Sequence, residues 1–269
     1  MIFPALTWIL LLLAAVLCAV GFYKFIYFTT VGHGLAAAGL ALCCLIIALS
    51  RGKSSPVLVL TVLLFLVYGL FLGGFTALGE LLRTSRRRAV KSDAEADTPV
   101  YVPLVIWLVC ALVSVMQISP LWYRVSAGIG KDSVFSWVSL IVMAGGLAII
   151  VLAQRQANKQ RQEDPSLPPM QGLYNWTRCP VQLGRLVFWT GALLGGIGFL
   201  GGLQWLIALI GYASAVFLAL RSAFRQDRRD RKKYGFLPEY REYAEDTHIL
   251  IPLIMPKNVK WEEEKEKTE

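Results

Sequence analysis

Two short stretches of the sequence carry polar side chains in patterns that could bind a charged ligand. The first, residues 172–191, places Arg178, Gln182 and Arg185 just before and within the start of a long apolar run. Arginine suits planar anions such as phosphate, because its guanidinium donates several hydrogen bonds in a fixed geometry. Arg178 and Arg185 are separated by about two helical turns, so we expect them to share a helix face, with Gln182 on or near it.

The second stretch lies near the C-terminus, in the sequence "LPEYREY". Tyr240 and Tyr243 are three residues apart and should lie on one face of a helix. Such a pair, with arginines nearby, could stack on an adenine ring and hold its phosphates. Arg221 and Arg225 are the arginines that we expect there. The candidate cofactor-binding residues are therefore Arg178, Gln182, Arg185, Arg221, Arg225, Tyr240 and Tyr243.

Each candidate residue also has a structural explanation, which the sequence leaves open. Arg185 could extend its side chain to lipid headgroups, and the tyrosines could belong to an amphipathic interfacial helix. The five cysteines and two histidines show no spacing typical of a metal site, so we expect no metal. The sequence alone identifies no catalytic residue.

Membrane-spanning helices must position these residues. The chain has 269 residues, 56% of them hydrophobic, and its mean hydropathy is +0.55. The apolar residues form blocks of about 20, the length that crosses a bilayer core of about 30 Å. We predict an all-α polytopic membrane protein with about seven transmembrane helices and a C-terminal cytoplasmic cap. The predicted spans are about 3–23, 32–50, 56–82, 101–119, 133–153, 183–200 and 203–221.

Glycines and charges predict how the last spans are connected. A cluster of glycines at residues 195–202 predicts a tight turn between spans six and seven. After span seven, the helix should continue to about Lys233, turn at Gly235 and return to the membrane surface. We expect residues 234–256 to be ordered there, and the charged residues 257–269 to be disordered.

Basic residues predict the orientation of the chain. The segments on one side of the predicted spans, with the tail counted only as far as Lys233, hold 17 lysines and arginines, against four on the other side. The four are Arg51, Lys53, Arg124 and Lys131. The positive-inside rule places the N-terminus outside and the C-terminus in the cytoplasm, as in a bacterial inner membrane. The net charge of +9 has the same explanation and does not indicate nucleic acid. Membrane lipids are the expected partners, and the sequence does not predict the oligomeric state.

Several stretches together resemble the steroid 5-alpha-reductase-like membrane family. The residues that carry the resemblance are "GLYNWTRCPVQLGRLVFWTG", "GGLQWLIALIGY" and "KKYGFLPEYREYAEDTHILIPLI", supported by "VYGLFLGGFTALGELLR" and "QISP". The resemblance divides the chain into two N-terminal helices (1–55), a family domain (56–256) and a charged tail (257–269).

The resemblance implies a reductase that holds NADPH in a crevice open to the cytoplasm. Its substrate would be a flat lipid, such as an enone, that enters from the bilayer. Hydride would pass to the β carbon of the enone while a donor polarises the carbonyl. The same arginine–proline core also resembles lipid and isoprenylcysteine methyltransferases, whose cofactor is S-adenosylmethionine.

The chain departs from the family pattern at several positions. Arg178, Cys179, Pro180 and Gly184 match, but Val181, Gln182 and Arg185 replace Asn, Tyr and Glu, and Phe71 replaces Arg. Three functions therefore remain open: an NADPH-dependent reductase, a non-catalytic member that binds lipid or a protein partner, and an S-adenosylmethionine-dependent lipid methyltransferase. A methyltransferase would need two carboxylates after the last span, where only Asp227 and Asp230 are available.

The predicted orientation can be tested by labelling single cysteines in a variant without the native cysteines. A membrane-impermeant thiol reagent added outside cells should modify Ser54→Cys and spare Ser166→Cys. The reverse labelling pattern would contradict the orientation.

Overall fold

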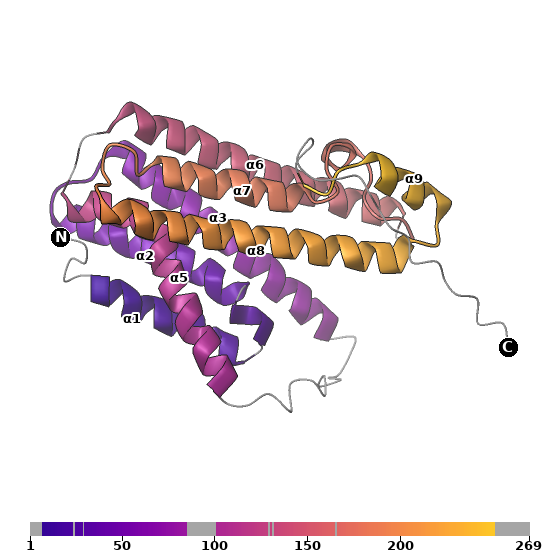
Figure 1. The fold of residues 1–269 in the computed structure, drawn as a ribbon, viewed down its shortest axis with the longest axis horizontal. Coiled ribbons are helices and arrows are strands. Elements are labelled where there is room, and N and C mark those ends of the chain that lie inside the picture. The colour runs from indigo at the N-terminus through magenta and orange to yellow at the C-terminus, as the bar shows by residue number, and fades with distance from the viewer. Residues whose placement is uncertain are drawn as a thin grey trace. The chain divides into compact units, whose positions relative to one another are not determined.

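The computed structural model describes residues 7–23, 25–28, 30–84, 101–128, 130, 132–164 and 166–250. Within these ranges the chain is helical and contains no strand, so the all-α prediction is confirmed there (Figure 1). The helices are α1 (Thr7–Cys18), α2 (Val31–Ser50), α3 (Pro56–Thr84), α5 (Tyr101–Ser126), α6 (Val134–Glu163), α7 (Pro180–Leu194), α8 (Leu203–Tyr234) and α9 (Pro238–Asp246). Short 3₁₀ turns occupy Ala19–Phe22, Phe25–Phe28 and Gly172–Asn175.

Five of these helices are long and apolar enough to cross a membrane: α2, α3, α5, α6 and α8. Five helices of this length and composition are those of an integral membrane protein. The apolar segment Thr7–Phe22 is shorter, and α7 has only 15 residues. The count of seven spans therefore stays a prediction.

The helix ends agree with the sequence at some positions and differ at others. α8 ends at Tyr234, one residue after the predicted end, and the glycine turn between α7 and α8 is present, with positive φ at Gly198 and Gly202. Span four was predicted to end at residue 119, but α5 continues through Pro120 to Ser126. A proline is tolerated inside an apolar helix where neighbouring helices compensate for the lost backbone hydrogen bond. Arg124, predicted in a loop, consequently lies in the last turn of α5.

The chain forms two compact units. Unit 1 comprises residues 1–144 and 189–215, and unit 2 comprises residues 145–188 and 216–269. This division follows packing, whereas the predicted boundary near residue 56 followed a family resemblance and stays a prediction.

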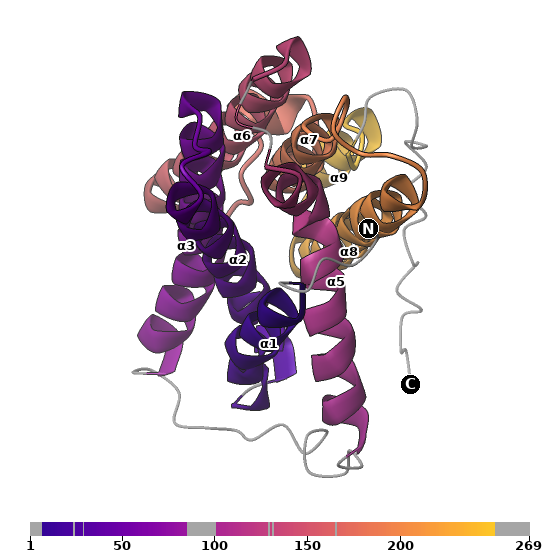
Figure 2. The same ribbon diagram turned by 90° about the vertical axis from the view of Figure 1, so that its left-hand side faces the viewer.

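Small residues set a close helix contact in unit 1, where α2 and α3 lie side by side (Figure 2). A Cβ added to Gly69 would overlap the carbonyl oxygen of Gly34, and one added to Gly34 would lie 2.8 Å from that of Gly69. Glycines therefore let the two backbones approach closely, as is common between helices in membranes.

A main-chain connection holds the end of the described chain in unit 2. The Arg178 amide donates to the His248 carbonyl (2.9 Å), and the Cys179 amide donates to the Ile249 carbonyl (3.1 Å). The Thr177 hydroxyl also donates to the Ile249 carbonyl (2.8 Å), and Leu250 is fully buried. The chain is therefore ordered as far as residue 250, as predicted, whereas its place at the membrane surface as a cytoplasmic cap stays a prediction. Residues 251–256, and the predicted disordered tail 257–269, lie outside the described residues.

The close contact between α2 and α3 predicts different effects for two glycine substitutions in α3. Gly69→Ala should destabilise the protein by about 1–3 kcal/mol, because the new methyl group meets backbone that cannot rotate away. Gly74→Ala is the matched control, since an added Cβ there has no neighbour within 4 Å among the described residues. Melting temperatures in detergent measure both effects. Equal temperatures for the two variants would contradict the prediction.

Candidate functional site

A small cavity of about 20 Å³ lies in unit 2, where residues distant in sequence come together. Arg161 contributes from the end of α6, and the linker before α7 contributes two prolines and Tyr174. α8 and α9 supply the remaining walls, and Figure 1 shows α9 beside this linker. The residues that carry polar side chains toward the cavity are Arg161, Tyr174, Arg178, Gln226, Asp227, Asp230, Tyr240 and Tyr243.

A buried cluster of charges forms one wall of this cavity. Nη1 of Arg178 lies 2.8 Å from Oδ1 of Asp227, and Nη2 of Arg231 lies 3.0 Å from Oδ2 of the same carboxylate. The side chains of Arg178 and Asp227 are only 4% and 1% exposed, so the aspartate is held almost entirely out of water. Charges at this depth persist only when they are paired. Nε of Arg178 and Nε of Arg231 have no hydrogen-bond partner in the part of the chain that the structure describes.

The predicted tyrosine pair also lines the cavity. The ring centroids of Tyr240 and Tyr243 are 6.1 Å apart on α9, which confirms that they share a face. The Tyr243 hydroxyl donates to the Tyr174 carbonyl (2.8 Å) and so joins α9 to the linker. Burial raises the pKa of Tyr174 to about 12, against the opposing effect of Arg161, and burial also raises the pKa values of Tyr240 and Tyr243. All three phenols are therefore protonated at neutral pH and can donate hydrogen bonds.

Cys179 lines the cavity but has the properties of a structural residue. Its side chain is 1% exposed and packs against Ala223 and Leu250. Burial raises the pKa of the Cys179 thiol, so the reactive thiolate is scarce at neutral pH. The thiol contacts the Ala223 carbonyl (3.6 Å). Cys179 therefore fixes the start of α7 against α8.

Two predicted residues of the motif lie away from the cavity. Gln182 is buried and donates to the Ser222 hydroxyl (3.0 Å), while Arg185 is half-buried and does not line the cavity. The prediction that Arg178 and Arg185 share a helix face is wrong, because α7 begins at Pro180 and Arg178 precedes it in non-helical backbone, with its amide bonded to the His248 carbonyl.

The two arginines predicted on α8 are also outside the cavity. Arg221 and Arg225 are exposed, whereas Asp227 is buried. At 3.6 residues per turn, positions two and six residues before Asp227 point away from its side of the helix. Of the seven predicted cofactor-binding residues, the structure therefore brings Arg178, Tyr240 and Tyr243 together, and leaves the other four outside.

The sequence did not point to three polar residues of the cavity, Arg161, Tyr174 and Gln226. It indicated Asp227 and Asp230 only as the carboxylates that a methyltransferase would need. A signal for the aspartates existed, because they are the only acidic residues in the basic stretch 221–233. An acidic residue among many basic residues indicates either an ion pair or a ligand-binding site. Arg161 and Tyr174 had no comparable signal, since nothing local distinguishes them from surface residues.

The buried ion pair predicts a large effect of neutralising its shared partner. Asp227→Asn leaves Arg178 buried without a counter-charge and should destabilise the protein by about 3–5 kcal/mol. Asp246→Asn at the exposed end of α9 is the matched control and should have little effect. Replacing both partners with apolar residues, in Arg178→Met with Asp227→Leu, should recover much of the loss. Thermal unfolding in detergent compares the variants. A melting temperature for Asp227→Asn equal to that of the control would refute the role of the pair.

Comparison with known proteins places the chain in a family. The sequence profile of the family described as "Protein of unknown function (DUF1295)" matches residues 21–247, which include the motif around Arg178 and all of α9. No curated protein and no solved structure matches the chain significantly. Because the match spans well over half of the 269 residues, the chain belongs to the DUF1295 family.

Proposed function

We propose that this protein is a membrane-embedded reductase that binds NADPH at the cavity of unit 2 and reduces a lipid of the enone type. The observation that carries the proposal is the meeting of Arg178 with Tyr240 and Tyr243 at one cavity. These residues come from the two stretches that resemble the cofactor-binding parts of the steroid 5-alpha-reductase-like family.

The donors at the cavity suit an anionic cofactor. Nε of Arg178 has no acceptor among the described residues and can donate to a phosphate oxygen, and exposed Arg161 adds a positive charge at the cavity. The faces of Tyr240 and Tyr243 suit an adenine or nicotinamide ring. NADPH, when bound, would supply the hydride that reduces the conjugated double bond. The chain's own residues would hold its phosphates and orient its rings.

The size of the cavity sets a condition on this proposal. About 20 Å³ admits a water molecule rather than a nucleotide, because about 10–15 Å³ is enough for one water. Cofactor binding therefore requires α9 and the segment that follows it to move away from the linker. The contacts that would open are the Tyr243 bond to Tyr174 and the bonds that Thr177, Arg178 and Cys179 make to the main chain after α9.

The membrane topology that accompanies this proposal has seven spans, with α1 and α7 as the shorter crossings. The N-terminus would lie outside and the cavity at the cytoplasmic face of a bacterial inner membrane. In this orientation a soluble cofactor reaches the cavity from the cytoplasm, and a lipid substrate reaches the protein from the bilayer.

A second candidate function is favoured by one observation. Asp227 and Asp230 both line the cavity, in a setting that also supplies arginines and tyrosines. Carboxylates bind ammonium groups and ribose hydroxyls, so this mixture of charges suits zwitterionic S-adenosylmethionine. The corresponding activity would be methylation of a lipid.

Cofactor titration distinguishes these functions. NADPH should bind the purified protein, and Arg161→Ala should weaken binding by about tenfold, since a charge-assisted hydrogen bond contributes about 1.5–3 kcal/mol. Arg225→Ala is the matched control, because Arg225 is an exposed arginine outside the cavity. Hydrogen exchange of the Arg178 and Cys179 amides should quicken when the cofactor binds, because their hydrogen bonds to the main chain after α9 would open.

The outcomes separate the candidates. Binding of S-adenosylmethionine with no binding of NADPH would contradict the reductase proposal and support the methyltransferase. Binding of neither cofactor would refute both enzymes and leave a non-catalytic family member that binds lipid or a protein partner. Equal weakening by Arg161→Ala and Arg225→Ala would place the cofactor elsewhere.

A further inference from the structure

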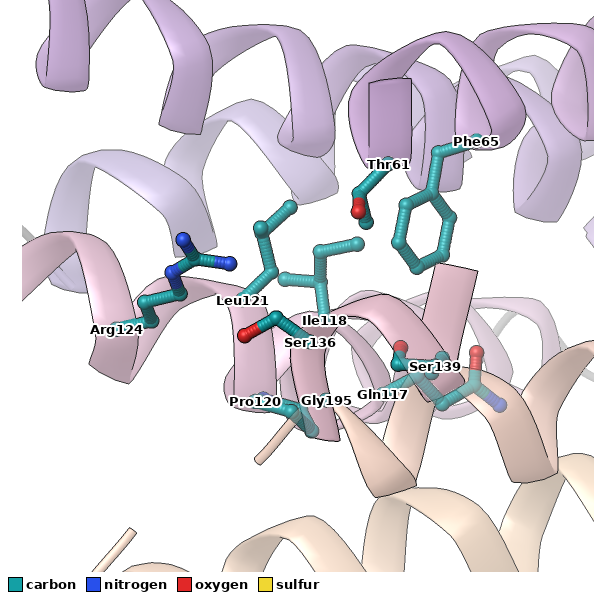
Figure 3. A pocket seen from close by; sticks show the side chains of 11 residues that line it. Thr61, Phe65, Gln117, Ile118, Pro120, Leu121, Arg124, Ser136, Ser139 and Gly195 are labelled. Carbon is teal, nitrogen blue, oxygen red and sulfur yellow. The ribbon is translucent and has the colours of Figure 1, made fainter. Parts of the chain in front are cut away.

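A second cavity, also of about 20 Å³, lies within unit 1 among apolar helices (Figure 3). Thr61 and Phe65 line it from α3, Gln117 and Arg124 from α5, and Ser139 from α6. Figure 3 places Gln117 and Arg124 at opposite ends. Polar side chains in helices of this kind are costly and mark cavities that hold a polar group.

The amide of Gln117 is fixed by its neighbour Ser214. The Ser214 hydroxyl donates its only proton to the Gly211 carbonyl, so it can only accept from Gln117. Nε2 of Gln117 therefore donates to Ser214 (3.1 Å). Oε1 of Gln117 is then the acceptor on the side away from Ser214. It has no hydrogen-bond partner among the described residues, although the side chain is buried and only 3% exposed.

The hydroxyl groups at this end of the cavity have also used their protons. The Thr61 hydroxyl donates to the Val57 carbonyl (2.8 Å), and the Ser139 hydroxyl donates to the Gly191 carbonyl (2.7 Å). Both oxygens can still accept hydrogen bonds. Together with Oε1 of Gln117 they form a set of acceptors, which favours a ligand that donates a proton over a ketone, an ether or an ester.

The other end of the cavity carries no net charge. Arg124 pairs with Asp132 and donates to the Ser55 hydroxyl (3.0 Å). Its guanidinium lies over the Phe199 ring, 5.1 Å from the centroid. Because Asp132 neutralises Arg124, the cavity does not favour an anion such as a fatty acid or a lipid phosphate.

We propose that the Gln117 end of this cavity binds the hydroxyl group of an uncharged, lipid-soluble alcohol. The hydroxyl donates to Oε1 of Gln117, and Phe65 and Ile118 supply apolar surface for the first carbons. The volume admits one hydroxyl group, which is about the size of a water molecule. Thr61 is half-buried and Leu60 and Leu63 beside it are exposed, so the hydrocarbon part leaves the cavity along α3 toward lipid.

Photolabelling in detergent tests this site. Three long-chain probes with the same diazirine are compared: an alcohol, a hydrocarbon and a carboxylic acid. The alcohol should label peptides of α3 and α5 most strongly. Gln117→Leu should lower its labelling by about tenfold, as expected for the loss of one buried hydrogen bond.

Two further variants separate binding from folding. Thr61→Val keeps the shape of the side chain, so it should fold normally and lower labelling by a few-fold, while exposed Ser50→Ala on α2 should leave labelling unchanged. Equal labelling by alcohol and hydrocarbon would mean that water alone fills the cavity and would overturn the proposal. Stronger labelling by the acid, or full labelling of a folded Thr61→Val and Gln117→Leu, would overturn it as well.

Discussion

The buried carboxylate of Asp227 is the interaction on which the structure of unit 2 depends. It pairs with Arg178, which precedes α7, and with Arg231, one turn further along α8. A 1%-exposed carboxylate is stable only with counter-charges, so Asp227 fixes the position of the motif against α8. The Arg178 amide donates a hydrogen bond to the His248 carbonyl, and this bond holds the segment after α9 against the linker. One side chain thus connects the linker, α8 and the end of the described chain.

This connection links the stability of the tail to the state of the cavity. Tyr240 and Tyr243 line the cavity only because α9 is held at both ends, by the turn at Gly235 and by the bridge between Thr177 and His248. Four hydrogen bonds between described residues tie the tail to the linker, and each contributes about 0.5–1.5 kcal/mol. In the proposed cofactor complex, binding of the cofactor would have to offset these hydrogen bonds, and α9 would be the element that moves.

The sequence predicted the features that depend on neighbouring residues. The turn at residues 195–202 follows from glycines that accept positive φ, the end of α8 follows from Gly235, and the shared face of Tyr240 and Tyr243 follows from helical spacing. The pairing of Arg178 with Asp227 was beyond the sequence, because the two residues are far apart along the chain and no local pattern selects one of several arginines. For the same reason we predicted Arg221 and Arg225 at the site. The turn of α8 that buries Asp227 leaves these two arginines exposed.

The two cavities use arginine in the same way. Arg178 and Arg124 are each buried, each is neutralised by an aspartate, and each has an Nε without an acceptor among the described residues. Neutralisation removes the long-range attraction for anions and leaves a directional donor, so the ligands proposed for the two cavities would be selected by hydrogen bonding rather than by net charge. For a phosphate at Arg178 this has a specific consequence. In the proposed cofactor complex, the phosphate would accept from Nε without displacing Asp227, so the ion pair that holds the unit together would persist.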